Sequence, residues 1–136
     1  MTTGALILLL LIAIVTIANG ANDVSKGVAT LAGSGVARAR RAILWGTVCT
    51  VAGGLAAIAW GGALAGSFGS GLVAPGFRID QTFLTATLLG ASLWLLFATR
   101  LGLPVSTTHA LLGGLVGAVL ASAGSDGLRI AVVANK

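Results

Sequence analysis

Long apolar stretches, separated by short polar clusters, divide this chain into segments of helical length. Charged side chains are absent from residues 1–22, 42–77, 81–99 and 101–125. A helix needs about 20 mostly apolar residues to cross the hydrocarbon core of a bilayer, and each stretch is long enough to supply one. The pattern predicts an all-α membrane protein, in which residues 1–136 form a single bundle of four to five transmembrane segments.

Polar interruptions predict that two of the helices are broken or re-entrant. The first interruption lies at 19–23, between helices expected at 4–18 and 24–36. The second lies at 101–105, where Pro104 suits the first turn of a new helix because its missing N–H has no partner to lose there. Non-helical backbone at membrane depth occurs only where it is buried in protein or lines a watery cavity. We therefore expect the two interruptions to lie close together in space.

The remaining helices are expected at 42–65, 81–100 and 105–123. Arginines at positions 38, 40, 41 and 100 fall on one side of the membrane if segments 4–36, 42–65 and 81–99 each cross once. Because basic residues are retained on the cytoplasmic side, we expect a multi-pass protein of the cell membrane with its N-terminus outside.

The composition supports a membrane location. Hydrophobic residues make up 57% of the chain, charged residues 8%, and the mean hydropathy is +1.05, whereas a soluble domain carries roughly 25% charged residues. The net charge of +5 then reflects basic residues at helix ends rather than nucleic-acid binding, because no basic stretch is interleaved with aromatic residues. The single cysteine, Cys49, excludes an internal disulfide and a multi-cysteine metal site.

The first polar cluster contains Asn22, Asp23 and Lys26, with Thr30 beyond them. An ionisable residue inside a membrane span is unfavourable and points to a functional site. Asp23 and Lys26 are three residues apart, so on a helix they share a face and can neutralise each other. A plain helix cap at Asn22 or Asp23, with Lys26 as its ion-pair partner, is the structural alternative. The density of polar groups within a membrane span favours a binding site.

The second polar cluster places Ser106, Thr107 and Thr108 directly after Pro104 and before His109. At a helix N-terminus, hydroxyl groups, unpaired N–H groups and the positive end of the helix dipole together suit an anion. Hydroxyl and carbonyl oxygens at the same place can also bind sodium. Ordinary capping is the structural alternative. A Ser106–His109 hydrolase would lack a nearby orienting carboxylate, so we do not expect an enzyme.

Two broken helices whose ends meet inside the membrane are typical of a secondary transporter. A channel and a non-transporting membrane subunit are the alternatives. Binding of an oxyanion distinguishes the transporter from the subunit, whereas a channel would pass current without a coupling ion.

In these two clusters the chain resembles the inorganic phosphate transporter family, the PiT or PHO4 group. The family signature Gly-Ala-Asn-Asp-Val-Ala-Asn-Ala corresponds to Gly-Ala-Asn-Asp-Val-Ser-Lys-Gly at 20–27, and Gly-Leu-Pro-Val-Ser-Thr-Thr-His is matched without change at 102–109. The resemblance implies symport of inorganic phosphate, or of sulfate as in some relatives, with sodium or protons. It also implies two inverted repeats.

Each motif occurs once, so the resemblance makes this chain the N-terminal repeat of an expected two. The partners it implies are membrane lipid and a second half of the transporter, supplied by a longer protein, by another copy of the chain or by a separate subunit. A half that does not transport without its partner is therefore an alternative function.

The resemblance and the two clusters together give the candidate site residues. The candidate contacts with the anion are Asn22, Asp23, Lys26, Thr30, Ser106, Thr107 and Thr108. The candidate contacts with the coupling ion, sodium or a proton, are Asn22, Asp23, Ser106, Thr107 and His109. No other cofactor and no structural metal is expected. Lys26 replaces the second asparagine of the family signature, and its ammonium can replace a bound cation, pair with Asp23 or contact the anion.

Overall fold

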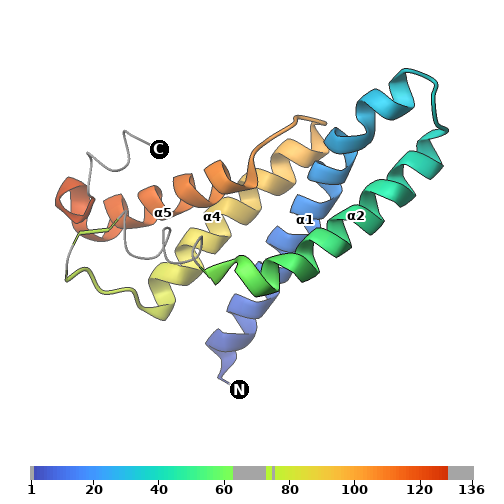
Figure 1. Cartoon of the computed structure of the whole chain (residues 1–136). Coiled ribbons are helices and arrows are strands. Elements are labelled where there is room, and N and C mark those ends of the chain that lie inside the picture. Colours follow the sequence, from blue (N-terminus) through green and yellow to red (C-terminus); the bar gives the residue numbers. More distant parts are fainter. Residues whose placement is uncertain (1, 63–72, 75, 129–136) are drawn as a thin grey trace.

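The computed structural model describes residues 2–62, 73–74 and 76–128, and this part of the chain is almost entirely helical (Figure 1). The elements in chain order are α1 (Thr3–Gly33), α2 (Ala39–Trp60), α4 (Gln81–Arg100), α5 (Thr107–Ala123) and a short 3₁₀ helix, η1 (Gly124–Gly127). Four helices in the described part are long and apolar enough to cross a membrane. The all-α membrane fold predicted from the sequence is confirmed.

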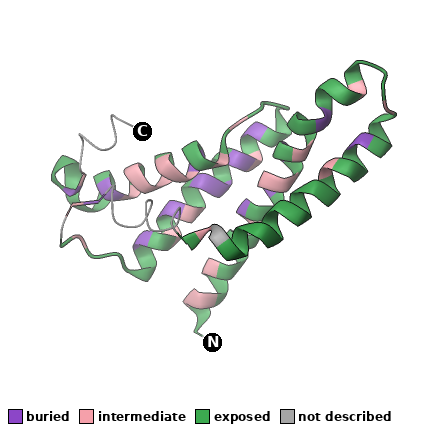
Figure 2. Ribbon diagram, viewed as in Figure 1, coloured by how far each residue is buried: buried purple, intermediate pink, exposed green. Residues whose placement is uncertain are grey.

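The helices form two antiparallel pairs, α1 with α2 and α4 with α5, which are joined by the contact between α1 and α4 (Figure 1). α1 packs against both α2 and α4, and α5 folds back along α4 (Figure 1). Small and branched side chains of α1, α4 and α5 form the main core: Val15, Ala18, Ala91, Leu95 and Ala110. Buried residues gather on α4 and on the faces turned toward it, while α2 is exposed along almost its whole length (Figure 2). This apolar exposed surface suits contact with lipid or with further protein.

The break predicted at 19–23 is wrong, because α1 continues without interruption from Thr3 to Gly33. Gly20 does not adopt a positive φ, and the stretch contains no proline. The Ser25 hydroxyl donates to the Asn22 carbonyl at 2.7 Å, a back-bond that a helix accommodates. The helices expected at 4–18 and 24–36 are therefore one helix of 31 residues. At 1.5 Å per residue it is about 46 Å long, longer than a bilayer core of about 30 Å.

The other helix boundaries agree more closely with the sequence. α4 has the predicted bounds, and the Asp80 carboxylate caps its first turn by accepting from the Phe83 N–H at 2.8 Å. α5 begins at Thr107 rather than at 105, because Ser106 is its N-cap. α2 begins at Ala39 rather than at 42. The end predicted for this helix at 65 lies outside the described residues.

The interruption predicted at 101–105 is confirmed, and it reverses the chain between α4 and α5. Gly102 has a φ of +68°, a conformation that glycine adopts without steric strain. Its N–H donates to the Thr99 carbonyl at 3.1 Å, and the Leu103 N–H donates to the Ala98 carbonyl at 2.9 Å. These two bonds are the pair that defines a Schellman helix end. Pro104 follows and prevents the helix from continuing.

Candidate functional site

The polar residues of α1 form a stripe along one face of the helix. Asn19, Asn22, Asp23 and Lys26 follow the spacing i, i+3, i+4 and i+7, so their side chains project on the same side of a continuous helix. Thr30 extends the stripe by one further turn. We call these five residues the α1 polar face. Continuity of the helix, which the sequence did not predict, is what aligns them.

Three hydrogen bonds join the α1 polar face to the α4–α5 connection. Asn22 Nδ2 donates to the Leu103 carbonyl at 3.4 Å, and Lys26 Nζ donates to the Val105 carbonyl at 2.6 Å. The Thr107 hydroxyl donates to Asn19 Oδ1. The partners lie 79 to 88 residues apart in sequence. The prediction that the two polar clusters meet in space is confirmed.

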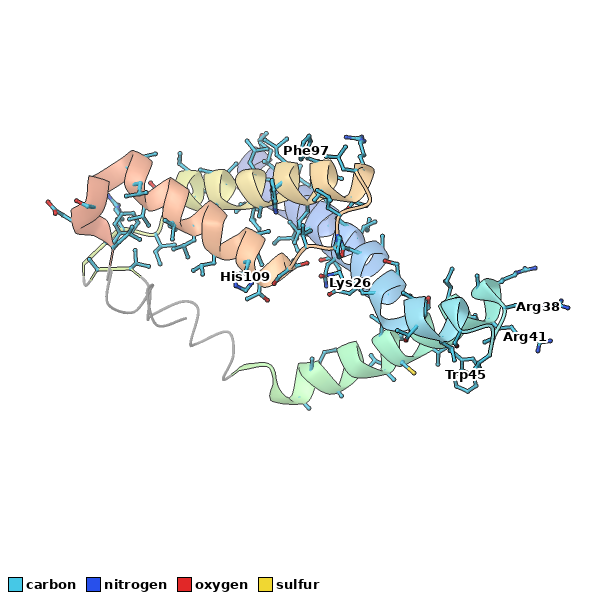
Figure 3. All side chains as sticks on the ribbon, turned by 90° about the horizontal axis from the view of Figure 1, so that it is seen from above. Lys26, Arg38, Arg41, Trp45, Phe97 and His109 are labelled. Atoms are coloured by element: carbon cyan, nitrogen blue, oxygen red, sulfur yellow. The ribbon has the colours of Figure 1, made fainter. Side chains whose placement is uncertain are left out.

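Lys26 is the charged centre of this contact. Its ammonium lies 2.8 Å from Asp23 Oδ1, and the two side chains are 35% and 49% exposed. The ammonium has three N–H donors, of which one serves Asp23 and one serves Val105. Figure 3 shows Lys26 beside the α4–α5 connection, whereas Arg38 and Arg41 lie at the distant end of the α1–α2 hairpin. Lys26 is thus placed to offer its third donor to a ligand.

A small cavity of about 120 Å³ lies between α1 and the α4–α5 connection. Its walls come from both elements: Ala21, Asn22, Ser25, Lys26, Thr99, Gly102, Leu103 and Pro104. Asn22 is only 6% exposed, and its Oδ1 has no hydrogen-bond partner in the described part of the chain. Because a buried polar atom normally has a partner, this oxygen marks a place where a ligand or water completes the structure.

The start of α5 forms a neighbouring but separate arrangement. The Ser106 hydroxyl accepts from the His109 N–H at 3.3 Å and lies 2.9 Å from His109 Nδ1. Ser106 and His109 also line a wider groove of about 810 Å³ along α4 and α5, together with Trp94 and several glycines. Thr108 is exposed and lines neither space.

The candidate residues therefore divide into two places. Asn22 and Lys26 line the small cavity, and Asp23 forms an ion pair with Lys26. Thr107 lies beside them and donates a hydrogen bond to Asn19 of α1. Ser106 and His109 line the groove instead. Thr30 is exposed further along α1 and does not line the small cavity.

Sequence reasoning missed Asn19 and Ser25, and it gave no weight to the carbonyl groups of Leu103 and Val105. Asn19 lies three residues before Asn22 and seven before Lys26, a spacing that would have identified it had the helix been read as continuous. Every residue carries a carbonyl, so no sequence signal distinguishes the two that accept these bonds.

The described helices are long and apolar enough for a multi-pass membrane protein, and an ion pair and a small cavity lie where α1 meets the α4–α5 connection. The chain belongs to the phosphate transporter family, whose family model matches residues 19–135. The family resemblance seen in the two motifs is confirmed.

Three relatives illustrate this membership. The chain is 38% identical over 107 residues to a "Putative phosphate permease" of Mycobacterium bovis, a match covering 75% of this chain and 19% of the relative. It is 38% identical over 114 residues to one of Helicobacter pylori, covering 81% and 21%. It is 35% identical over 111 residues to one of Pyrococcus abyssi, covering 79% and 27%. The matches thus span about a fifth to a quarter of these relatives. No solved structure matches the chain.

Proposed function

We propose that this chain contributes one half of a secondary transporter that carries inorganic phosphate by symport across the cell membrane. The observation that carries the proposal is the position of Lys26, whose ammonium bridges Asp23 and the Val105 carbonyl just before the start of α5. A fixed positive charge beside a helix N-terminus is suited to an oxyanion. The names of the relatives support phosphate as that oxyanion.

The anion would bind between α1 and the first turn of α5. Lys26 offers its uncommitted N–H, and the first N–H groups of a helix have no intrahelical partner, which makes those of Thr107 and Thr108 available. Asp23 neutralises Lys26 while the site is empty. An arriving anion would compete with Asp23 for the ammonium, so binding and release of the anion would alter the contact between α1 and α5.

The second half of the site would come from the rest of a longer protein, from another copy of this chain or from a separate subunit. The extent of the relatives beyond the matched region supports this arrangement. Transporters built from two repeats bind their substrate between the repeats, near the middle of the membrane. We propose that the N-terminus faces outward, as the arginine positions predict.

The test is uptake of radiolabelled phosphate into proteoliposomes that contain the assembled transporter, in which the chain is present with its second half. Saturable uptake that is driven by an imposed pH or sodium gradient is the expected result. Lys26→Met should abolish it, while Arg41→Met, at the far end of the α1–α2 hairpin, should leave it unchanged. Uptake without any gradient dependence would indicate a channel, and absence of both uptake and phosphate binding would indicate a subunit with another role.

A further inference from the structure

We propose that acceptor groups on α1, led by Asn22 Oδ1, select an oxyanion that carries its own hydrogen, so that the small cavity takes hydrogen phosphate and rejects sulfate. This inference rests on the proposed function and adds the basis of its substrate choice. The two anions have the same tetrahedral shape and similar size. At neutral pH inorganic phosphate retains at least one hydrogen, whereas sulfate has none, so a hydrogen-bond acceptor in the site can distinguish them.

Two hydroxyl groups near the cavity, those of Thr107 and Ser25, already donate to the protein and so do not donate to an anion. The Thr107 hydroxyl donates to Asn19 Oδ1, and the Ser25 hydroxyl donates to the Asn22 carbonyl at 2.7 Å. A hydroxyl has one hydrogen and two lone pairs. Toward a ligand in the small cavity, the Ser25 oxygen therefore acts only as an acceptor, whereas Thr107 is not among the residues that line this cavity.

Asn22 supplies the second acceptor in this cavity. Its Nδ2 donates to the Leu103 carbonyl, which orients the amide in the absence of a ligand, because the opposite orientation would place two acceptors against each other. Oδ1 is then left buried without a partner in the described residues. The bond to Leu103 is 3.4 Å long, beyond the usual range for N–H···O bonds. It yields readily, so the side chain can turn its oxygen toward the cavity it lines.

Lys26 explains why the ligand must nevertheless be an anion. Among the described residues that line the cavity it is the one charged side chain, and its third N–H has no partner in this part of the chain. A ligand that satisfies both Lys26 and the acceptors needs a negative charge and a hydrogen to donate. The cavity volume of about 120 Å³ is several times the minimum that one water requires. A five-atom oxyanion therefore fits it.

The expected selectivity follows from the cost of leaving a buried acceptor unpaired. Sulfate would displace any water that completes Asn22 Oδ1 and would give this buried oxygen no partner in return, which weakens binding by about 10-fold to 100-fold. A site that hydrogen-bonds a particular group of its substrate rejects analogues that lack this group, because a buried polar group of the site is then left unpaired.

The experiment is displacement of radiolabelled phosphate from the unmodified chain in lipid nanodiscs at neutral pH. Arsenate, which keeps a hydrogen as phosphate does, should compete within a few-fold of phosphate, and sulfate should be at least about 10-fold weaker. Sulfate that competes as well as phosphate would overturn the inference. Failure to bind any phosphate would overturn the proposed function itself, so the two failures are distinguishable.

Variants locate the selectivity in the acceptors. Asn22→Leu keeps the approximate shape without the oxygen, and it should lower the phosphate-to-sulfate affinity ratio by about 10-fold. Asn22→Asp keeps an acceptor and should retain the preference for phosphate while weakening the binding of both anions.

Ser25→Ala should also lower the phosphate-to-sulfate affinity ratio, and it tests the inference even if Asn22→Leu fails to fold. Its matched control is Ser122→Ala. The Ser122 hydroxyl also donates to a carbonyl of its own helix, at 2.8 Å, but Ser122 is not among the residues that line the cavity. An unchanged ratio in Ser25→Ala and Asn22→Leu would contradict the inference.

Discussion

The ammonium of Lys26 donates to the carbonyl oxygen of Val105 at 2.6 Å, which ties the middle of α1 to the residue just before the N-cap of α5. This contact joins the two sequence motifs and brings a fixed positive charge to the positive end of a helix dipole. The field at this point is positive from both sources, and Asp23 compensates it only in part. An anion bound here would complete the balance of charge.

We predict that Lys26 determines which ion drives transport in the proposed transporter. The ammonium already occupies a position between a carboxylate and a carbonyl oxygen, two ligand types that sodium prefers. We therefore expect phosphate uptake by the unmodified chain to depend weakly on sodium and strongly on a pH gradient. Lys26→Asn restores the residue of the family signature, and it should either make uptake sodium-dependent or abolish it because Asp23 loses its partner. The measurement is uptake in sodium against choline buffer. Strong sodium dependence in both proteins would show that Lys26 has no part in coupling.

Thr107 should act through Asn19 rather than by donating to the anion. Thr107→Val removes the hydroxyl that Asn19 Oδ1 accepts, leaving the amide short of a partner, so phosphate affinity should fall by roughly 10-fold. Asn19→Leu should cause a loss of similar size. The double variant should lose little more than either single variant, because both remove one interaction. Fully additive losses in equilibrium binding would mean that each residue contacts the ligand independently.

Two glycines should respond to alanine in opposite ways. Gly102 has a φ of +68°, and a Cβ there would meet no atom within 4 Å. Gly102→Ala therefore adds only backbone strain and should destabilise the protein by about 1–2 kcal/mol. Gly20→Ala lies inside a continuous helix with open space around it and should stabilise the protein by about 0.5–1 kcal/mol. Thermal unfolding in detergent followed by circular dichroism measures both. Destabilisation by Gly20→Ala would contradict an unbroken α1.

The close approach of α4 and α5 can be tested at two adjacent positions. A Cβ at Gly114 would collide with the backbone carbonyl of Thr87, whereas one at Gly113 would meet nothing within 4 Å. Gly114→Ala should therefore separate the helices and destabilise the protein by about 1–3 kcal/mol. Gly113→Ala is the matched control and should be tolerated. Equal effects of the two substitutions on the midpoint of thermal unfolding would mean that the helices are further apart.

The sequence predicted the parts of the fold that local chemistry determines. α4 has its predicted bounds because Asp80 caps a long apolar run, and the reversal after it follows from Gly102 and Pro104. The predicted break in α1 failed because helix propensity is a weak prior that tertiary contacts override. In the structure the amides of Asn19 and Asn22 bond to the α4–α5 connection instead of capping a new helix.

The candidate site was predictable in its main residues but not in its hydrogen-bond roles. An unusual density of polar groups in apolar segments identified Asn22, Asp23 and Lys26. The sequence could not reveal that the Thr107 and Ser25 hydroxyls donate to the protein, because their partners are set by how α1 meets α5 and by the continuity of α1. Because of these roles, the site offers a ligand hydrogen-bond acceptors as well as hydrogen-bond donors.

Equilibrium binding of radiolabelled phosphate in lipid nanodiscs tests the central claim most directly, because it requires neither a gradient nor a complete transport cycle. The comparison is between the unmodified chain, Lys26→Met and Arg41→Met. We expect saturable binding by the unmodified chain and by Arg41→Met, and a loss of at least about 10-fold in affinity for Lys26→Met, since hydrogen bonds to charged groups are among the strongest in proteins. Equal phosphate affinity in all three proteins would contradict a phosphate site between α1 and the start of α5.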